Sequence, residues 1–238
     1  RTGNSMRRRL AWFDRSGKEV GTLGTPDEND LNNPEISPDG RRVAVSRIVQ
    51  GNTDVWLVEA ARGVFTRFSF DAAAEICPIW SVDGSQIAFS SNRKSVYDLY
   101  QKASNGAGSE ESLLESSQAK YPLAWSRDSR FLLYAQMDPK TNRDLWVLPL
   151  FGERKPFPFV NTSFVEANGQ FSPDGRLVAY ISNESSRYEV YVQPFPSGSG
   201  RYQISWHGGN WPRWRRDGKE LFYFTIAATP DTAARQRE

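Results

Sequence analysis

Three glutamates are the residues whose type and position could do hydrolytic chemistry. Glu35, Glu75 and Glu166 each lie beside a short segment of strand-forming residues. Two carboxyl groups about 5 Å apart, or about 6.5–9.5 Å apart, are what a retaining or an inverting glycosidase needs. A glycosidase is therefore one alternative for this chain. Spacing along the sequence does not set those separations, and ordinary charges at the rim of a fold explain the same residues.

Other residues with catalytic chemistry are sparse. His207 is the one histidine, and no Gly-x-Ser-x-Gly segment supplies the nucleophile of a Ser-His-Asp hydrolase. Cys77 is the one cysteine, which excludes an internal disulfide and a cysteine-rich zinc site. We expect it to be a buried structural thiol, and His207 to be a loop residue. His-Glu-x-x-His and EF-hand patterns are absent, so we expect no catalytic residue, metal site or cofactor.

Composition and net charge limit the classes of partner that the chain is expected to bind. The 238 residues are 38% hydrophobic and 13% aromatic, with eight Trp, so the chain can fill a core with rings that suit pleated sheets. The formal net charge of +2 gives no broad attraction for nucleic acid. No run approaches the ~18 apolar residues of a membrane helix, so we expect no direct membrane insertion.

One turn recurs through the whole chain. Ser-Pro-Asp-Gly at 37–40 and 172–175 has three variants, which begin at residues 81, 126 and 215. The five copies start 44, 45, 46 and 43 residues apart. Asp-Gly between two strand-like runs is a strong hairpin signal, because Gly adopts positive φ and Asp bonds nearby backbone. We therefore interpret the five aspartates as turn formers, and expect a looser turn, or one of another type, where Ser129 replaces Gly.

Each turn lies between two β-type segments, and two further segments follow. The first of these has an acidic, an aliphatic and an aromatic residue in succession, as in Asp98-Leu99-Tyr100. Four short strands per unit of about 45 residues are typical of a propeller blade. The sequence predicts an all-β fold, a β-propeller of four-stranded blades with five blade equivalents. The large residue before each turn is expected to pack between blades: Ile36, Trp80, Trp125, Phe171 and Trp214.

The two ends carry half a blade each. Residues 10–24 resemble an outer strand pair, and residues 211–226 resemble an inner pair. The strands form a closed five-bladed ring, or they are an excerpt of a six-bladed one, which we favour because the chain starts inside a blade. Accordingly we expect a flexible flank at 1–9, a single propeller domain at 10–226 and a polar tail at 227–238.

Several segments resemble a known repeat family. "PEISPDGRRVAVSR", "PIWSVDGSQIAFSSN" and "GQFSPDGRLVAYISNES" are similar to the PD40, or WD40-like, repeats of TolB-type propellers. "LAWFDRSGKEVGTLG" and "WPRWRRDGKELFYF" resemble more narrowly the propellers fused to bacterial serine/threonine kinase domains. This resemblance implies a sensing or protein-binding module of a larger bacterial protein, placed in the periplasm or otherwise outside the cytoplasmic membrane. Fold likeness alone does not define activity.

Binding residues are expected where inner strands begin. Strand alternation directs the residue two before each turn toward a central channel, and loops on a rigid scaffold commonly bind ligands. We predict a monomer that binds a protein or peptide and catalyses nothing. The alternatives are the gating propeller of a prolyl-oligopeptidase-like peptidase and the glycosidase above. The predicted channel-face residues are Glu35, Glu75, Lys120, Glu166, Gln170, Asn210 and Arg213.

Overall fold

The fold is built from β-strands throughout the part of the chain that the structure describes. This computed structural model describes residues 8–27, 29–196 and 200–225. These ranges contain no helix that is long and apolar enough to cross a membrane. In chain order the strands are β1 (Arg8–Phe13), β2 (Glu19–Asp27), β3 (Leu31–Ile36), β4 (Arg42–Val49), β5 (Asn52–Glu59), β6 (Phe65–Arg67), β7 (Glu75–Trp80), β8 (Gln86–Ser91), β9 (Asp98–Ala103), β10 (Glu111–Leu114), β11 (Lys120–Trp125), β12 (Phe131–Asp138), β13 (Asn142–Pro149), β14 (Phe157–Val160), β15 (Glu166–Phe171), β16 (Leu177–Ser182), β17 (Glu189–Pro194), β18 (Tyr202–Gln203), β19 (Asn210–Trp214) and β20 (Leu221–Phe224).

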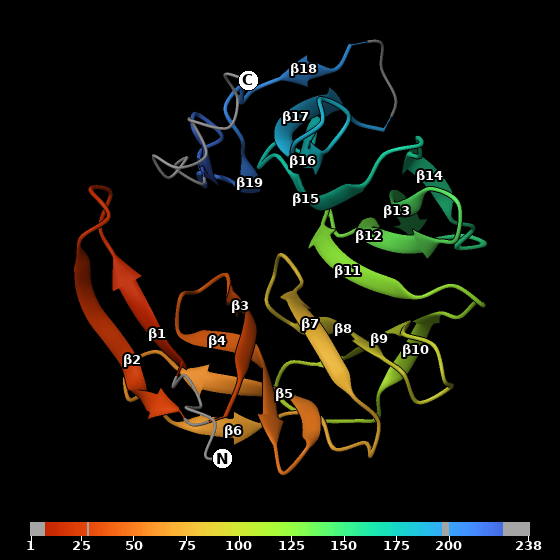
Figure 1. Ribbon diagram of the computed structural model, residues 1–238. Coiled ribbons are helices and arrows are strands. Elements are labelled where there is room, and N and C mark those ends of the chain that lie inside the picture. The colour runs from red at the N-terminus through yellow and green to blue at the C-terminus, as the bar shows by residue number, and fades with distance from the viewer. Residues whose placement is uncertain (1–7, 28, 197–199, 226–238) are drawn as a thin grey trace, which may run out of the picture. The chain divides into compact units, whose positions relative to one another are not determined.

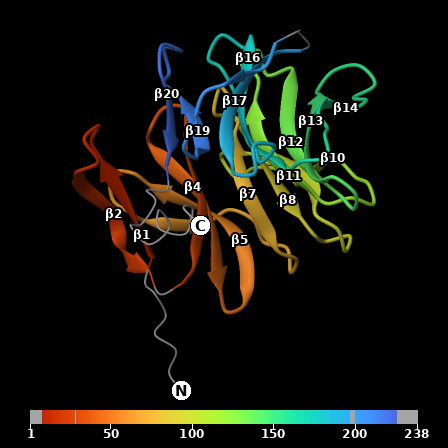
Figure 2. The same cartoon turned by 45° about the horizontal axis from the view of Figure 1, so that its top comes forward.

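The chain divides into two compact units, residues 1–125 and 126–238. In the first unit, β3–β6 and β7–β10 form two antiparallel sheets in chain order, and β1 pairs with β2 (Figure 1). In the second unit, β12–β14 pair in chain order and β15–β18 form a four-stranded sheet (Figure 1), and β19 pairs with β20 (Figure 2). The predicted four-stranded repeat is confirmed, while the number of blades stays a prediction.

Large apolar side chains fill the space between successive sheets. In the first unit, Trp80 of β7 is 6% exposed and packs with Ala44 and Leu57 of the preceding sheet. In the second unit, Phe171 of β15 is also 6% exposed and contacts Phe195 of its own sheet edge-on at 4.9 Å, and Phe195 contacts Phe131 of β12 at 5.2 Å. The prediction that these residues pack between blades is confirmed for Trp80. It is wrong for Ile36, which is 50% exposed.

The repeated quartet forms one turn, as predicted. In the first copy the Ser37 hydroxyl donates to Asp39 Oδ1 at 2.6 Å and accepts the Arg42 N–H at 2.9 Å. The Gly40 N–H closes the turn on the Ser37 carbonyl at 2.8 Å. The turn joins β3 to β4, so the aspartate is a turn former, and its hydrogen bonds lower the pKa of Asp39.

The third copy of the turn corrects one expectation. Ser129 adopts φ 55° in the position of the glycine, and its N–H bonds the Ser126 carbonyl at 2.9 Å. The Ser126 hydroxyl also donates to Asp128 at 2.6 Å, as in the other serine copies. The prediction of a looser turn was wrong, because these bonds hold a non-glycine residue in the left-handed region.

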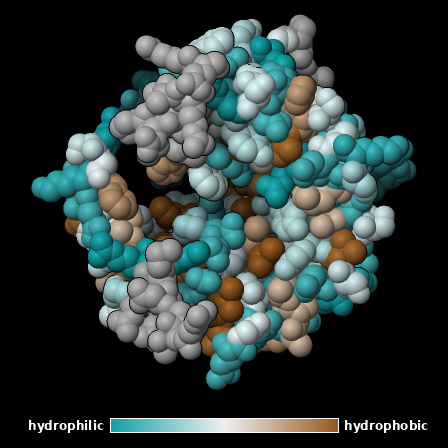
Figure 3. All heavy atoms as spheres, viewed as in Figure 1, coloured by the Kyte–Doolittle hydropathy of each residue, from teal (hydrophilic) through white to brown (hydrophobic). Residues whose placement is uncertain are grey.

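The predicted boundaries are partly testable. β1 begins at Arg8, so a strand enters the predicted flank of residues 1–9. Residues 1–7 of that flank and the predicted tail at 227–238 lie outside the described residues. Figure 3 shows the surface in view as mainly hydrophilic, with scattered hydrophobic side chains.

Candidate functional site

Three predicted site residues are the first residues of inner strands and are completely buried. Glu75 begins β7, Lys120 begins β11 and Glu166 begins β15, each with 0% exposure. Asn210 begins β19 and is half-buried. All four residues begin inner strands, where binding residues were expected, but the three charged side chains are buried. Partners from a third strand and from the segments between strands make this burial possible.

A junction is defined here as the acid near the start of a third strand, the hydroxyl after the fourth strand, and the first residue of the next inner strand. Junctions 1 and 2 lie in the first unit, and junctions 3 and 4 lie in the second. Their residues are Asp54, Ser69 and Glu75; Asp98, Ser116 and Lys120; Asp144, Thr162 and Glu166; and Glu189, Ser205 and Asn210.

Junction 2 is a buried ion pair. The Lys120 ammonium donates to Asp98 Oδ1 at 2.7 Å, to the Ser116 hydroxyl at 2.9 Å and to the Gln118 carbonyl at 2.5 Å. Asp98 also accepts the Ser116 N–H at 3.1 Å. All three ammonium hydrogens therefore have an acceptor, which offsets the desolvation of the charge.

Junction 1 contains a carboxyl group whose pKa is raised by its surroundings. Arg93 donates to both Glu75 and Glu110, and its guanidinium lies 4.2 Å from the centre of the Tyr100 ring. Burial, followed by the negative charge of Glu110, raises the pKa of Glu75 to about 7. One arginine balances one of the two carboxylates, so burial favours the protonated form of the other.

A bulge lies inside the inner strands of four sheets. Asn33, Cys77, Asn168 and Trp211 have φ of 50°, 55°, 53° and 47°, and the strand register shifts beside each one. A bulge redirects the following side chains, which simple alternation does not anticipate. The sequence feature that could have predicted these bulges is proline, which lies inside three of these strands, at 34, 78 and 212. Cys77 is half-buried, where a buried thiol was expected.

The remaining predicted residues lie after these bulges. In the first unit, Glu35 is half-buried and its carbonyl accepts the Trp80 indole N–H at 3.0 Å. In the second unit, Gln170 accepts the Trp214 N–H at 2.7 Å, and Asn210 accepts the Asn168 amide at 2.7 Å. The structure thus uses these polar groups to connect successive inner strands. Arg213 is exposed.

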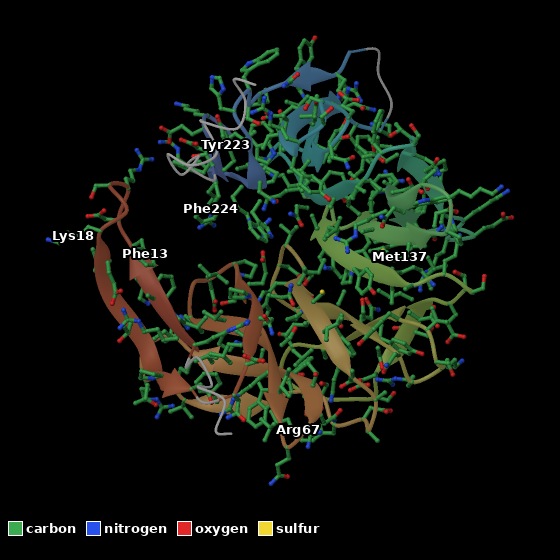
Figure 4. The ribbon with its side chains drawn as sticks, in the orientation of Figure 1. Phe13, Lys18, Arg67, Met137, Tyr223 and Phe224 are labelled. Carbon is green, nitrogen blue, oxygen red and sulfur yellow. The ribbon has the colours of Figure 1, made fainter. Side chains whose placement is uncertain are left out.

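An exposed cluster of aromatic residues surrounds Arg213 on β19 and β20. Trp211 is 54% exposed, Phe222 47% and Phe224 69%, and the Trp211 and Phe224 rings meet edge-on at 6.4 Å. Arg213 pairs with Phe222 across the two strands, so their side chains lie on the same side of the sheet. Phe224, the last residue of β20, is labelled in Figure 4. We call Trp211, Arg213, Phe222 and Phe224 the aromatic face.

In the described ranges, no group of three or more His, Cys, Asp and Glu residues could hold a metal ion. His207 is exposed in the segment between β18 and β19, where the sequence predicted a loop.

Comparison with known proteins places the chain in a family. The PD40 model, described as the TolB beta propeller domain, matches residues 28–148, about half of the chain. No curated protein matches the sequence.

Solved structures show the same fold at low sequence identity. A protein assigned as TolB in Agrobacterium tumefaciens has a TM-score of 0.80 and 17% identity over 94% of this chain and 80% of its own. TolB from Acinetobacter baumannii has a TM-score of 0.78 and 18% identity over 92% of this chain, which spans 54% of that protein. An oligogalacturonate lyase in complex with manganese has a TM-score of 0.65 and 14% identity, over 94% of this chain and 68% of its own. The chain is thus an all-β propeller with four-stranded blades, and it belongs to the PD40 family of TolB beta propeller domains.

Proposed function

We propose that this chain is a non-catalytic propeller module that binds a protein or a peptide through its aromatic face. The observation that carries the proposal is the exposure of three large rings around an arginine on one two-stranded sheet. Trp, Tyr and Arg dominate the residues that contribute most to protein–protein affinity, and clustered exposed apolar groups mark interaction sites. Two TolB propellers among the similar structures support this class of function.

The proposal divides the predicted site residues by accessibility. Arg213 and the half-buried Asn210 lie on β19 and are assigned to partner contact. Glu75, Lys120 and Glu166 are buried in the junctions and are assigned to holding the sheets together. Glu35 and Gln170 remain predicted contact residues. The finer resemblance to kinase-fused propellers makes a sensing role in a larger bacterial protein part of the same proposal.

Peptide selection tests the proposal directly. Short random peptides displayed on phage are selected on the immobilised chain, and the affinity of the enriched peptides is measured with the wild type and with the Trp211→Asn, Phe224→Ser double variant. Asparagine tolerates the positive φ of position 211, so the backbone is not strained by the change. Losing two central aromatic anchors should weaken binding by about a hundredfold.

The matched control is Phe13→Ser, which removes a ring of similar exposure, 61%, from β1. Its affinity should equal that of the wild type. If no peptide is enriched, or if the control and the double variant lose affinity equally, the aromatic face is not the binding site. Circular dichroism of each variant confirms that the strands are retained.

A further inference from the structure

The aromatic face is the side of the β19–β20 pair that is turned away from the sheet β15–β18. Leu221 of β20 packs against a core cluster that contains Ile181 of β16 and Val190 of β17. Side chains alternate along a strand, so Phe222 and Phe224 point to the opposite side. They are 47% and 69% exposed. One side of this strand pair is therefore buried against its neighbour, and the other side carries exposed rings.

The positions of Phe222 and Phe224 are buried in each of the four-stranded sheets. The equivalent residues, counted from the repeated turn, are Ala44 and Ser46, Ala88 and Ser90, Leu133 and Ala135, and Ala179 and Ile181. Each of them is at most 3% exposed. Ala44 lies in one core cluster with Trp80 and Ile87, which belong to strands of the next sheet. In this fold, extended strands pack on this side of a sheet, so the aromatic face has the shape that receives an extended segment.

The β19–β20 hairpin is basic. Residues 210–224 carry four cationic and two acidic side chains, a net charge of +2, which equals the formal net charge of the whole chain. Arg215 binds both acids, with Asp217 Oδ1 and Glu220 Oε2 each at 2.6 Å. Arg216 and Lys219 are exposed and form no ion pair with an acid in the described ranges. The surface beside the rings therefore attracts negative charge.

The rings and the cations lie toward different ends of the hairpin. The Trp211 and Phe224 rings meet where β19 begins and β20 ends. Arg213 lies farther along β19, and Arg216 and Lys219 belong to the turn region that joins the two strands. Along the hairpin, the exposed surface thus changes from aromatic to cationic.

We propose that the partner of the aromatic face is an extended protein segment with large apolar side chains at one end and acidic side chains at the other. This inference rests on the proposed function, since it names the class of partner for the same face. The apolar end would cover Trp211 and Phe224, and the carboxylates would bind Arg213, Arg216 and Lys219. Guanidinium groups bind carboxylates through paired hydrogen bonds, and a basic segment would instead place like charges together.

Two libraries of displayed peptides test the charge of the partner. In both, one half of each peptide is drawn from apolar residues, and both orders of the two halves are included; the other half is acidic in one library and basic in the other. Selection on the immobilised chain should enrich the acidic library, and the affinity of the enriched peptides should fall as salt screens the charges. The Arg213→Gln, Arg216→Gln, Lys219→Gln triple variant should bind them about tenfold more weakly, because it loses three exposed charge contacts.

A second triple variant is the matched control. Arg9→Gln, Arg62→Gln and Lys94→Gln together remove the same number of exposed cations, all from ion pairs of the first unit. This variant should keep the wild-type affinity, which separates local contacts from the net charge of the chain. The melting temperature, Tm, of both triple variants is measured alongside. If the first of them melts lower, Arg216→Glu alone, in the exposed turn, should still weaken the acidic peptides.

The outcomes distinguish this inference from the proposed function. Enrichment of the basic library, or acidic peptides that the first triple variant binds as well as the wild type does, would overturn the acidic partner. The proposed function would still stand if the Trp211→Asn, Phe224→Ser double variant lost those peptides, and it would fail as well if neither library were enriched. A second copy of the chain is the other occupant. Dimers of the wild type in sedimentation velocity that the double variant does not form would show that the face binds itself, and would overturn the inference.

Discussion

Replacing Lys120 by methionine should unfold this protein at a markedly lower temperature. The Lys120 side chain is 0% exposed and that of Asp98 is 4% exposed, so water cannot replace the lost ammonium. The substitution would leave a buried carboxylate with the Ser116 N–H at 3.1 Å as its remaining contact in the junction. Breaking a buried pair by removing one partner costs about 3–5 kcal/mol. For a domain of this size that corresponds to a fall in Tm of about 6–20 °C.

Urea unfolding of three variants measures the effect. Lys120→Met should lower the free energy of unfolding by the amount above, and Asp98→Asn added to it should restore about half, because the unpaired charge is gone. Lys94→Met is the matched control: its partner is Glu115, its side chain is 59% exposed, and its loss should cost less than about 1 kcal/mol. If Lys120→Met costs no more than Lys94→Met, or if the double variant recovers nothing, the pair does not stabilise the junction.

Two further predictions concern protonation and backbone strain. The pKa of Glu75 rises from 4.5 to about 7 in the folded protein, so the folded state holds an extra proton between those values. The free energy of unfolding should therefore fall by up to about 3 kcal/mol as pH rises from 5 to 7, and Glu75→Gln should flatten this slope in urea unfolding measured across pH. Ser129→Gly should raise the free energy of unfolding by about 0.5–1 kcal/mol, since Ser129 holds φ 55°; an unchanged or lower value in thermal unfolding would contradict this.

The strands and turns were predictable because each repeat unit carries the same local chemistry. Asp39 accepts a hydrogen bond from nearby backbone, and Gly40 adopts the positive φ that the turn needs. Neither effect depends on the rest of the molecule. Alternation of apolar residues likewise predicts which face of a strand is buried. The third turn differed from prediction because the Ser126 hydroxyl stabilises it as well as in the other copies.

The site was less predictable because it depends on contacts between repeats. The sequence shows that Glu75 precedes an inner strand, but not that Arg93, eighteen residues later, folds back onto it. Nor does it show that Trp211 adopts a positive φ. The strand register shifts there, so the direction of the Arg213 side chain differs from what simple alternation predicts. The aromatic face could be suspected from the Trp and Arg residues of β19, but the exposure of Phe224 depends on what packs beside β20.

In this structure, a repeat position whose residue type varies does not by itself indicate a ligand-binding site. The contacts of each residue at that position decide the matter. The first residue of the inner strand is glutamate, lysine, glutamate and asparagine in successive junctions, and such variety resembles a surface adapted to a ligand. Glu75 and Lys120 are instead each matched by an opposite charge inside the same unit. Glu166 is the exception, since its carboxyl group accepts hydrogen bonds from the Thr162 and Ser182 hydroxyls in place of a cation. Function is therefore best sought where rings remain uncovered, on the aromatic face.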